Sequence, residues 1–314
     1  MVRVVIPPDC FCEPEPNNSQ TNSGTNNGTN SGTNGTNGTN NTGGGTSSTF
    51  RDLSDDPLDP DDEDLAPGSL TGFPGGLRAL AGDDTVNGST ADELINGNRG
   101  QDSLLGAEGQ DTLRGGRDSD RVFGENGNDV VNGNKDNDIV LGGDGNDIVR
   151  GGQGNDLIVG GEDDDTLIGD FGLDMLVGGE DDDLFVLRTG ASGSDSLGAD
   201  LILDFNASDD DIGLTEGVTF NNLEFQEVSL DLTSQLTVLA IFGNADIATL
   251  SGINTAALDP DGDGTVRGTL IQIDPDDEIQ GRGNYLGFVV NATESDLSRQ
   301  RFVEAVPDSV LGQG

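Results

Sequence analysis

Residues 142–161 read GGDGNDIVRGGQGNDLIVGG, which is one nine-residue phrase followed at once by a close copy of itself. Each copy begins with two glycines and carries an aspartate at its sixth position and an aliphatic residue at its eighth. A fixed period has to be interpreted before any other pattern, because each repeat needs its neighbours to bury its apolar side. The period of nine therefore decides the fold of this region.

The phrase recurs from residue 79 to residue 186 as twelve consecutive repeats without an insertion. The first position is Gly in every repeat except the first, which has Ala79. The sixth positions hold acids: Asp84, Glu93, Asp102, Asp111, Asp120, Asp129, Asp138, Asp147, Asp156, Asp165, Asp174 and Asp183. The eighth positions hold apolar residues: Val86, Ile95, Leu104, Leu113, Val122, Val131, Val140, Val149, Ile158, Leu167, Leu176 and Phe185.

A spacing of nine does not fit the helical period, whereas the aliphatic and β-branched residues near the end of each repeat favour a short strand. The glycine-rich residues before them favour a tight turn. One strand and one turn make half a coil, so two repeats complete a turn of 18 residues. The sequence predicts an all-β protein, in which a parallel β-roll with the eighth-position side chains inside is capped by a C-terminal antiparallel β-sandwich.

Stacked turns place residues 18 apart side by side, so Asp147 is expected beside Asp129 and Asp165, with Asp156 at the opposite edge. Rows of like charge repel one another unless cations lie between them. Two carboxylates and several loop carbonyls offer the oxygen-rich shell that Ca²⁺ takes, whereas Mg²⁺ demands a more rigid octahedron. The alternative is a metal-free solenoid whose acids face solvent.

The predicted calcium ligands are sixth-position carboxylates together with glycines of the two most regular turns. They are Asp102, Asp111, Asp120, Asp129, Asp138, Asp147, Asp156, Asp165, Asp174, Asp183, Gly142, Gly143, Gly145, Gly151, Gly152 and Gly154. Twelve repeats in two columns of six leave five gaps per column, so up to about ten ions are expected. Residues 79–186 contain 26 acids and six bases, and ten divalent ions would cancel this net charge of −20. The best sites are expected between Asp129 and Asp165, and the weakest around Asp84 and Glu93.

Composition excludes several classes of function. The 314-residue chain has a formal net charge of −45, which opposes binding to nucleic acid or to an anionic membrane surface. It contains no His, which removes the usual general base and zinc ligand, and it has neither an HExxH nor a GxSxG motif. We therefore expect a protein that is not an enzyme. Cys10 and Cys12 are too close in sequence to form a disulfide framework, and they are expected to be free or paired between molecules.

Other segments have their own compositions. Residues 1–16 form a short N-terminal segment without a secretory h-region, and residues 17–78 are a low-complexity and then acidic stretch expected to be a disordered linker. No apolar run is long enough to span a membrane. Residues 79–186 are the expected roll, and residues 187–314 alternate apolar and polar residues as a β-rich capping domain.

Residues 259–264 begin like an EF-hand loop but have Leu270 where that loop needs a bidentate Glu, so calcium binding there stays open. Residues 293–303 are expected to form a short helix.

The phrases GGDGNDIVR and GGQGNDLIV resemble the GGxGxDxUx nonapeptide of RTX (repeats-in-toxin, haemolysin-type calcium-binding) proteins. The strands expected after Asp183 and Asp200 are similar to the usual end of that family's rolls. The resemblance implies calcium binding, export through a type I channel, and folding on meeting external calcium. The last residues, SRQRFVEAVPDSVLGQG, lack the terminal apolar motif of the family's protease branch, so the resemblance leaves the export route open.

These observations predict a secreted or cell-surface calcium-binding protein with a structural, matrix or adhesion role. Two alternatives remain: an accessory, non-catalytic module of an RTX exoenzyme or toxin, and a carbohydrate- or protein-binding module acting through the C-terminal domain. The expected partners are calcium and, beyond it, a cell-surface polysaccharide or protein, with no nucleic acid and no transmembrane segment. The oligomeric state is left open by the sequence.

Overall fold

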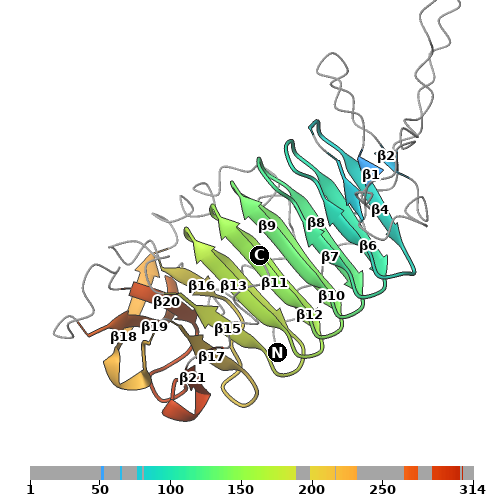
Figure 1. The fold of residues 1–314 in the computed structure, drawn as a ribbon. Helices are drawn as coiled ribbons and strands as arrows, with labels where there is room; N and C mark the ends of the chain where they lie inside the picture. Colours follow the sequence, from blue (N-terminus) through green and yellow to red (C-terminus); the bar gives the residue numbers. More distant parts are fainter. Residues whose placement is uncertain are drawn as a thin grey trace, which may run out of the picture.

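The structure, a computed structural model, describes residues 51–52, 64–65, 76–79, 81–188, 199–215, 217–231, 265–274, 285–304 and 306. These residues are almost entirely strands and turns, wound into a roll in which two sheets face each other (Figure 1). Successive strands of the repeat region alternate between the two sheets, so every strand pairs with the strand two places away in the chain. The predicted all-β parallel roll is confirmed.

The first sheet contains, in spatial order, β1 (Arg51–Asp52), β3 (Leu77–Arg78), β5 (Leu94–Asn96), β7 (Thr112–Arg114), β9 (Val130–Lys135), β11 (Ile148–Gln153), β13 (Thr166–Phe171), β15 (Leu184–Leu187), β17 (Asp211–Leu214) and β21 (Phe302–Glu304). The second contains β18 (Leu223–Asp231), β19 (Thr265–Ile273), β20 (Tyr285–Val290), β16 (Asp200–Ile202), β14 (Met175–Gly179), β12 (Leu157–Glu162), β10 (Ile139–Asp144), β8 (Arg121–Asn126), β6 (Ser103–Glu108), β4 (Thr85–Ser89) and β2 (Asp64–Leu65). Within the described residues, two short 3-10 helices precede strands of the C-terminal part: Phe220–Asn222 before β18 and Arg299–Arg301 before β21.

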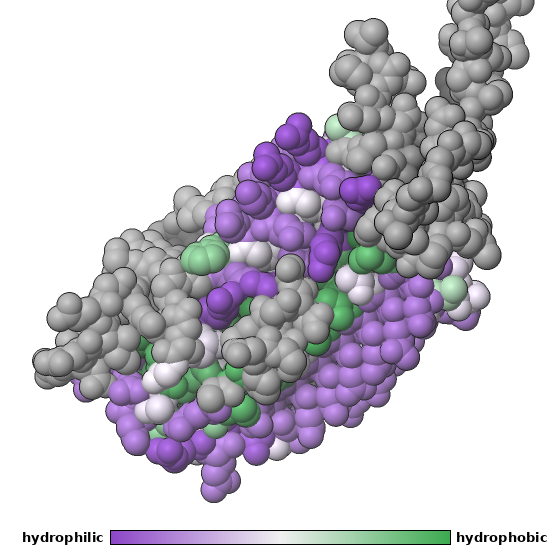
Figure 2. Space-filling model, viewed as in Figure 1, coloured by the Kyte–Doolittle hydropathy of each residue, from purple (hydrophilic) through white to green (hydrophobic). Residues whose placement is uncertain are grey.

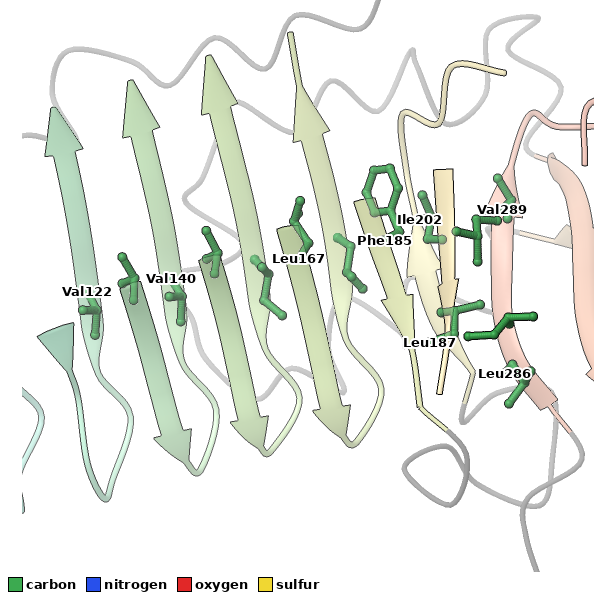
Figure 3. Close-up of a cluster of buried hydrophobic side chains, with 14 of the residues drawn as sticks. Val122, Val140, Leu167, Phe185, Leu187, Ile202, Leu286 and Val289 are labelled. Carbon is green, nitrogen blue, oxygen red and sulfur yellow. The ribbon is translucent and has the colours of Figure 1, made fainter. Parts of the chain in front are cut away.

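The register of the strands follows from the nine-residue period. Val140 of β10 lies opposite Ile158 of β12, and Val149 of β11 lies opposite Val131 of β9, so residues 18 apart are neighbours in parallel strands. All eighth-position side chains from Val86 to Phe185 are fully buried, and they form one continuous column of the core between the sheets (Figure 3). Each repeat therefore buries its apolar residue only through its neighbours.

The roll begins before the first full repeat. Leu77–Arg78 pairs with β5, and the two-residue strands β1 and β2 pair with β3 and β4. The segment expected to be a disordered linker thus contributes three short strands to the two sheets.

The C-terminal strands continue the sheets of the roll. β16 and β20 extend the second sheet in parallel, and β18 and β19 then add to it as an antiparallel pair. β17 and β21 extend the first sheet. Phe220, Phe225 and Phe302 pack against one another at this end, with ring centroids 5.1 to 5.8 Å apart. The expected antiparallel sheet is present as β18, β19 and β20 of the second sheet, whereas β17 and β21 continue the first sheet in parallel.

The short helix expected over residues 293–303 is wrong for most of that stretch. Only a single 3-10 turn forms, and Phe302 then enters β21, where it lies opposite Ile212 of β17. Pairing with the open edge of the first sheet and burial of Phe302 override the local helical preference.

The second sheet is also apolar on its outer face, from β10 onward. Alternate side chains there form a second buried cluster that includes Ile139, Leu157, Met175 and Phe288. Hydrophobic residues accordingly appear as a band between hydrophilic surfaces in Figure 2. None of the helices in the described ranges is long and apolar enough to cross a membrane.

Candidate metal centre

The turns between strands repeat one unusual backbone conformation. Residues at the second and fourth positions have positive φ, as in Gly143 (130°) and Gly145 (121°). Other residues at these positions have the same sign, as Asn134 (82°) and Asp136 (71°) show, except Ser89 and Ala91 in the turn of Glu93. This conformation favours Gly, Asn and Asp, which explains why Asp replaces Gly at the fourth position of several repeats.

The sixth-position acids form two columns, one along each edge of the roll. The main-chain N–H of Asp129 donates to Oδ1 of Asp147 at 2.7 Å, and that of Asp147 donates to Oδ1 of Asp165 at 2.8 Å. At the opposite edge the N–H of Asp138 donates in the same way to Asp156 at 2.8 Å. Acids 18 residues apart thus lie in adjacent turns, and Asp147 and Asp156 belong to different columns.

All ten predicted acidic ligands are buried, with at most 3% of the residue exposed: Asp102, Asp111, Asp120, Asp129, Asp138, Asp147, Asp156, Asp165, Asp174 and Asp183. In each except Asp183, Oδ2 is buried without a hydrogen-bond partner, and the same holds for Asp84. Buried polar atoms without partners are rare in folded proteins and costly. Oδ1 of each acid therefore accepts a backbone N–H from the adjacent turn. Its Oδ2, except in Asp183, stays buried without a hydrogen-bond partner.

The first-position glycines leave room beside these free oxygens. A β-carbon at Gly142 would lie 2.2 Å from Oδ2 of Asp147 and 2.8 Å from the carbonyl oxygen of Gly160 in the next turn. At Gly124 the corresponding distances are 2.4 Å to Asp129 and 2.6 Å to the carbonyl of Gly142. At Gly151 the β-carbon would lie 2.4 Å from Oδ2 of Asp156. The space that a side chain would fill is bordered by a carboxylate oxygen and, at the first two, also by a carbonyl oxygen of the adjacent turn.

The other predicted glycines bring further carbonyl groups to the same edges. A β-carbon at Gly143 would fall 1.9 Å from the carbonyl oxygen of Glu125, and one at Gly145 would fall 2.1 Å from that of Gly127. Gly152 and Gly154 approach the carbonyl oxygens of Asn134 and Asp136 in the same manner, at 2.4 and 1.9 Å. At the φ of these four glycines, 118 to 151°, a β-carbon would strike the backbone of the preceding turn, whereas Asn134 and Asp136 at the same positions have φ of 82 and 71°.

Burial perturbs the titration of the columns. It raises the pKa of Asp138 from 3.8 to about 10, and the neighbouring Asp156 carboxylate adds to this shift. Burial likewise raises the pKa of Asp165 to about 9 and that of Asp102 and Asp147 to about 7. Desolvation and like-charge repulsion both disfavour the carboxylate form. The columns are stable only if the acids are protonated or if a cation neutralises them.

The donor set fits a hard cation that accepts many oxygen ligands. No three acidic side chains converge on one point within the described part of the chain, so a cation there has to draw on backbone carbonyls as well as carboxylates. Ca²⁺ takes six to eight oxygens, including carbonyls, in flexible geometry. The sixth-position Oδ2 atoms and the carbonyls of the turns are the groups that would hold it, and their role as ligands stays a prediction.

Two acids that the sequence did not assign to the columns extend them. The N–H of Asp174 donates to Oδ1 of Asp200 at 3.3 Å, and that of Asp183 donates to Oδ1 of Asp210 at 3.1 Å. The spacing here is 26 and 27 residues instead of 18. The available signal was an acid directly before an apolar strand, as in Asp200-Leu-Ile-Leu. The other oxygen of Asp210 accepts the N–H of Asn206 at 2.7 Å, so this acid closes its column.

Glu93 departs from the pattern at the other end. Its carboxylate accepts the N–H of Ser89 at 2.9 Å within its own turn, so the longer side chain bends back, although its N–H still donates to Oδ1 of Asp111 at 2.7 Å. The EF-hand-like residues 259–264 and the pair Cys10 and Cys12 lie outside the described residues.

Comparison with known proteins agrees with this geometry. The sequence model of the RTX calcium-binding nonapeptide repeat (4 copies) matches residues 77–104, 105–140, 141–176, 150–185 and 159–197. No curated protein matches the chain. The matched span contains all ten acids whose columns form the two edges of the roll.

Proposed function

We propose that this chain, whose residues 77–197 are calcium-binding repeats of the RTX family, is a secreted protein that folds when it meets calcium outside the cell. Its role there is structural, as part of a matrix, a surface layer or an adhesive contact. The observation that carries the proposal is the row of buried Oδ2 atoms without partners along both edges of the roll.

Calcium binding and folding are one process in this proposal. The columns exist only after the turns have stacked, because each acid reaches the backbone of the turn before it, as Asp147 reaches Asp129. A site that is absent from the unfolded chain contributes its binding free energy to folding. A chain that lacks calcium during export would therefore stay unfolded and would fold after release.

The number of ions follows from the stack. Up to about ten cations, five gaps in each of two columns, would balance the net charge of −20 on residues 79–186. Acidic extracellular calcium modules bind with dissociation constants of about 10⁻⁴ to 10⁻³ M, and we expect this range here.

The absence of His and of recognisable hydrolase motifs supports a non-catalytic role. The continuous core and the pairing of nearly every described strand to a neighbour support a rigid element. In our proposal bound calcium makes the β-roll of the repeats rigid, and the C-terminal strands cap the end of the roll.

Circular dichroism of the full chain tests the proposal. In EDTA we expect a spectrum dominated by disordered chain, and millimolar Ca²⁺ should produce a strong β signal with a cooperative dependence on its concentration. Equal Mg²⁺ should produce little change, because it prefers rigid octahedral sites with retained water. An identical spectrum in EDTA and in calcium would refute the proposal.

A further inference from the structure

The two edges of the roll carry opposite charges at the third position of each turn. At one edge this position holds Arg99, Arg117 and Lys135 in three successive turns, which we call the basic row. At the other edge it holds Glu108, Asn126, Asp144, Glu162 and Glu180, which we call the acidic row. A run of three bases is unexpected in a chain that has only 14 Lys and Arg against 59 acids.

Both rows are in register along the stack. The N–H of Arg117 donates to the carbonyl of Asn98 at 3.0 Å, which joins its turn to the turn of Arg99, and Lys135 lies opposite Gln153. In the acidic row, Asp144 lies opposite both Asn126 and Glu162. Neighbouring strands are about 4.8 Å apart, so both rows have the same spacing between charges.

The basic row is free to meet a partner. Arg99, Arg117 and Lys135 are exposed, and their side chains form no ion pair with any residue that the structure describes. Glu108, Asp144 and Glu162 of the acidic row are exposed as well. Figure 2 shows the turns of the roll as hydrophilic surface.

Three acids lie beside the basic row, and each is partly committed to the backbone. Oδ1 of Asp83 accepts the N–H of Gln101 at 2.7 Å. Oδ2 of Asp118 accepts the N–H of Gly100 at 3.3 Å, and Oδ2 of Asp136 accepts that of Asp118 at 3.1 Å. These carboxylates bend along the stack, whereas the acidic row has further acids around it at Asp163 and Asp164. The third positions therefore still differ in sign between the two edges.

We propose that the basic row of one molecule binds the acidic row of a second copy of this chain, side by side. Charge complementarity and equal spacing support a second copy as the partner, because both halves of the contact are present in one sequence. Asp144 and Glu162 supply two consecutive exposed acids to this contact, and Glu108 supplies a third beyond Asn126. The two surfaces differ, so the contact is heterologous and propagates into an open assembly of rolls.

The assembly depends on calcium, and in this respect it rests on the proposed function. The column acids Asp102, Asp120 and Asp138 lie in the same turns as the basic row, and their charge opposes it until cations neutralise them. Salt weakens the contact, since charges on exposed surfaces are screened beyond about 8 Å at physiological ionic strength.

Sedimentation velocity of the full chain in saturating calcium tests the proposal. We expect concentration-dependent association at about 0.01 M ionic strength that weakens at about 0.15 M. The triple variant R99E/R117E/K135E should self-associate at least about tenfold more weakly, as should E108K/D144K/E162K. An equimolar mixture of the two variants should associate again, because each then carries one sign on both edges.

The Asn126→Glu variant separates a specific contact from general repulsion. It fills the gap in the acidic row and should strengthen association, although it makes the chain more acidic. Weaker association of this variant, or failure of the mixed variants to associate, would overturn the proposal. A chain that gains β signal in calcium but stays monomeric refutes the lateral contact alone, whereas a chain that gains none refutes the proposed function.

Discussion

The main-chain N–H of Asp129 donates to Oδ1 of Asp147, 2.7 Å away in the next turn, while Oδ2 of Asp147 stays buried without a partner. The same two-part use of a carboxylate recurs along both edges of the roll. One oxygen aligns the turns, and the other has no partner within the protein. The proposed function therefore couples folding and calcium binding at every step of the stack.

Replacing Asp147 by Asn should weaken calcium binding while leaving the turn able to stack. The amide oxygen can still accept the N–H of Asp129, but the negative charge is lost from a buried position. We expect the calcium concentration at the folding midpoint to rise several-fold, and each tenfold rise would correspond to about 1.4 kcal/mol. Calcium titration followed by circular dichroism measures it.

The matched control is Asp144→Asn, which removes the same charge three residues away at an exposed third position. It should leave the midpoint close to that of the parent chain. Equal shifts in the two variants would mean that net charge, and not the column, determines calcium affinity.

Replacing Gly142 by Ala should also impair calcium binding, for a steric reason. The new β-carbon would lie 2.2 Å from Oδ2 of Asp147 and would occupy the space beside the free oxygen. Gly142 does not have a positive φ, so the loss would come from crowding at the site and not from backbone strain. We expect a higher calcium midpoint and a lower unfolding temperature in calcium. An unchanged midpoint would show that this space holds no ligand.

Truncating the core should destabilise the calcium-bound roll. Leu167 is fully buried in the column of eighth-position side chains, and Leu167→Ala should lower the free energy of unfolding by about 2 to 5 kcal/mol. The neighbouring Thr166→Ala, at a half-buried outer position, should lower it by much less. Urea unfolding in saturating calcium compares the two, and similar losses would contradict the assignment of inside and outside.

Lowering the pH should promote folding of the metal-free chain. Burial raises the pKa of Asp102 from 3.8 to about 7, which corresponds to about 4 kcal/mol for this one acid. Between these values the folded state binds more protons than the unfolded state, so stability falls as the pH rises. In EDTA the β signal should therefore grow as the pH is lowered from about 8 to about 5.

With calcium present the pH dependence reverses. Calcium binding requires ionised carboxylates, so the apparent affinity for calcium should increase with pH. A β signal in EDTA that grows with rising pH would contradict this account.

Much of the roll could be predicted from the sequence because its contacts are periodic. A fixed spacing of nine places Val149 inside, beside Val131, and Asp147 beside Asp129, without knowledge of any distant residue. The period also separates Asp147 from Asp156. The positive φ at Gly143 was not predicted, because several residue types occupy the second position and hide its common conformation.

The ends of the roll could not be predicted in the same way. Asp200 and Asp210 join the columns at irregular spacing, and β21 pairs with β17 across about ninety residues of sequence. Such pairing depends on which edge strand is left unpaired, and the local sequence pattern does not show which edge that is. The buried cluster on the outer face of the second sheet, around Leu157 and Met175, could not be predicted either. Its residues have the composition of any strand, and the sequence does not show that this face is buried.

Hydrogen exchange of the backbone amides in residues 97–186, measured with and without calcium, tests the coupling of folding to calcium most directly. The account predicts strong protection of the N–H groups of Asp129, Asp138 and Asp147 in calcium and rapid exchange in EDTA near neutral pH, with protection lost along the whole stack. Equal protection of these amides in both conditions would contradict it, because the columns would then form without a cation.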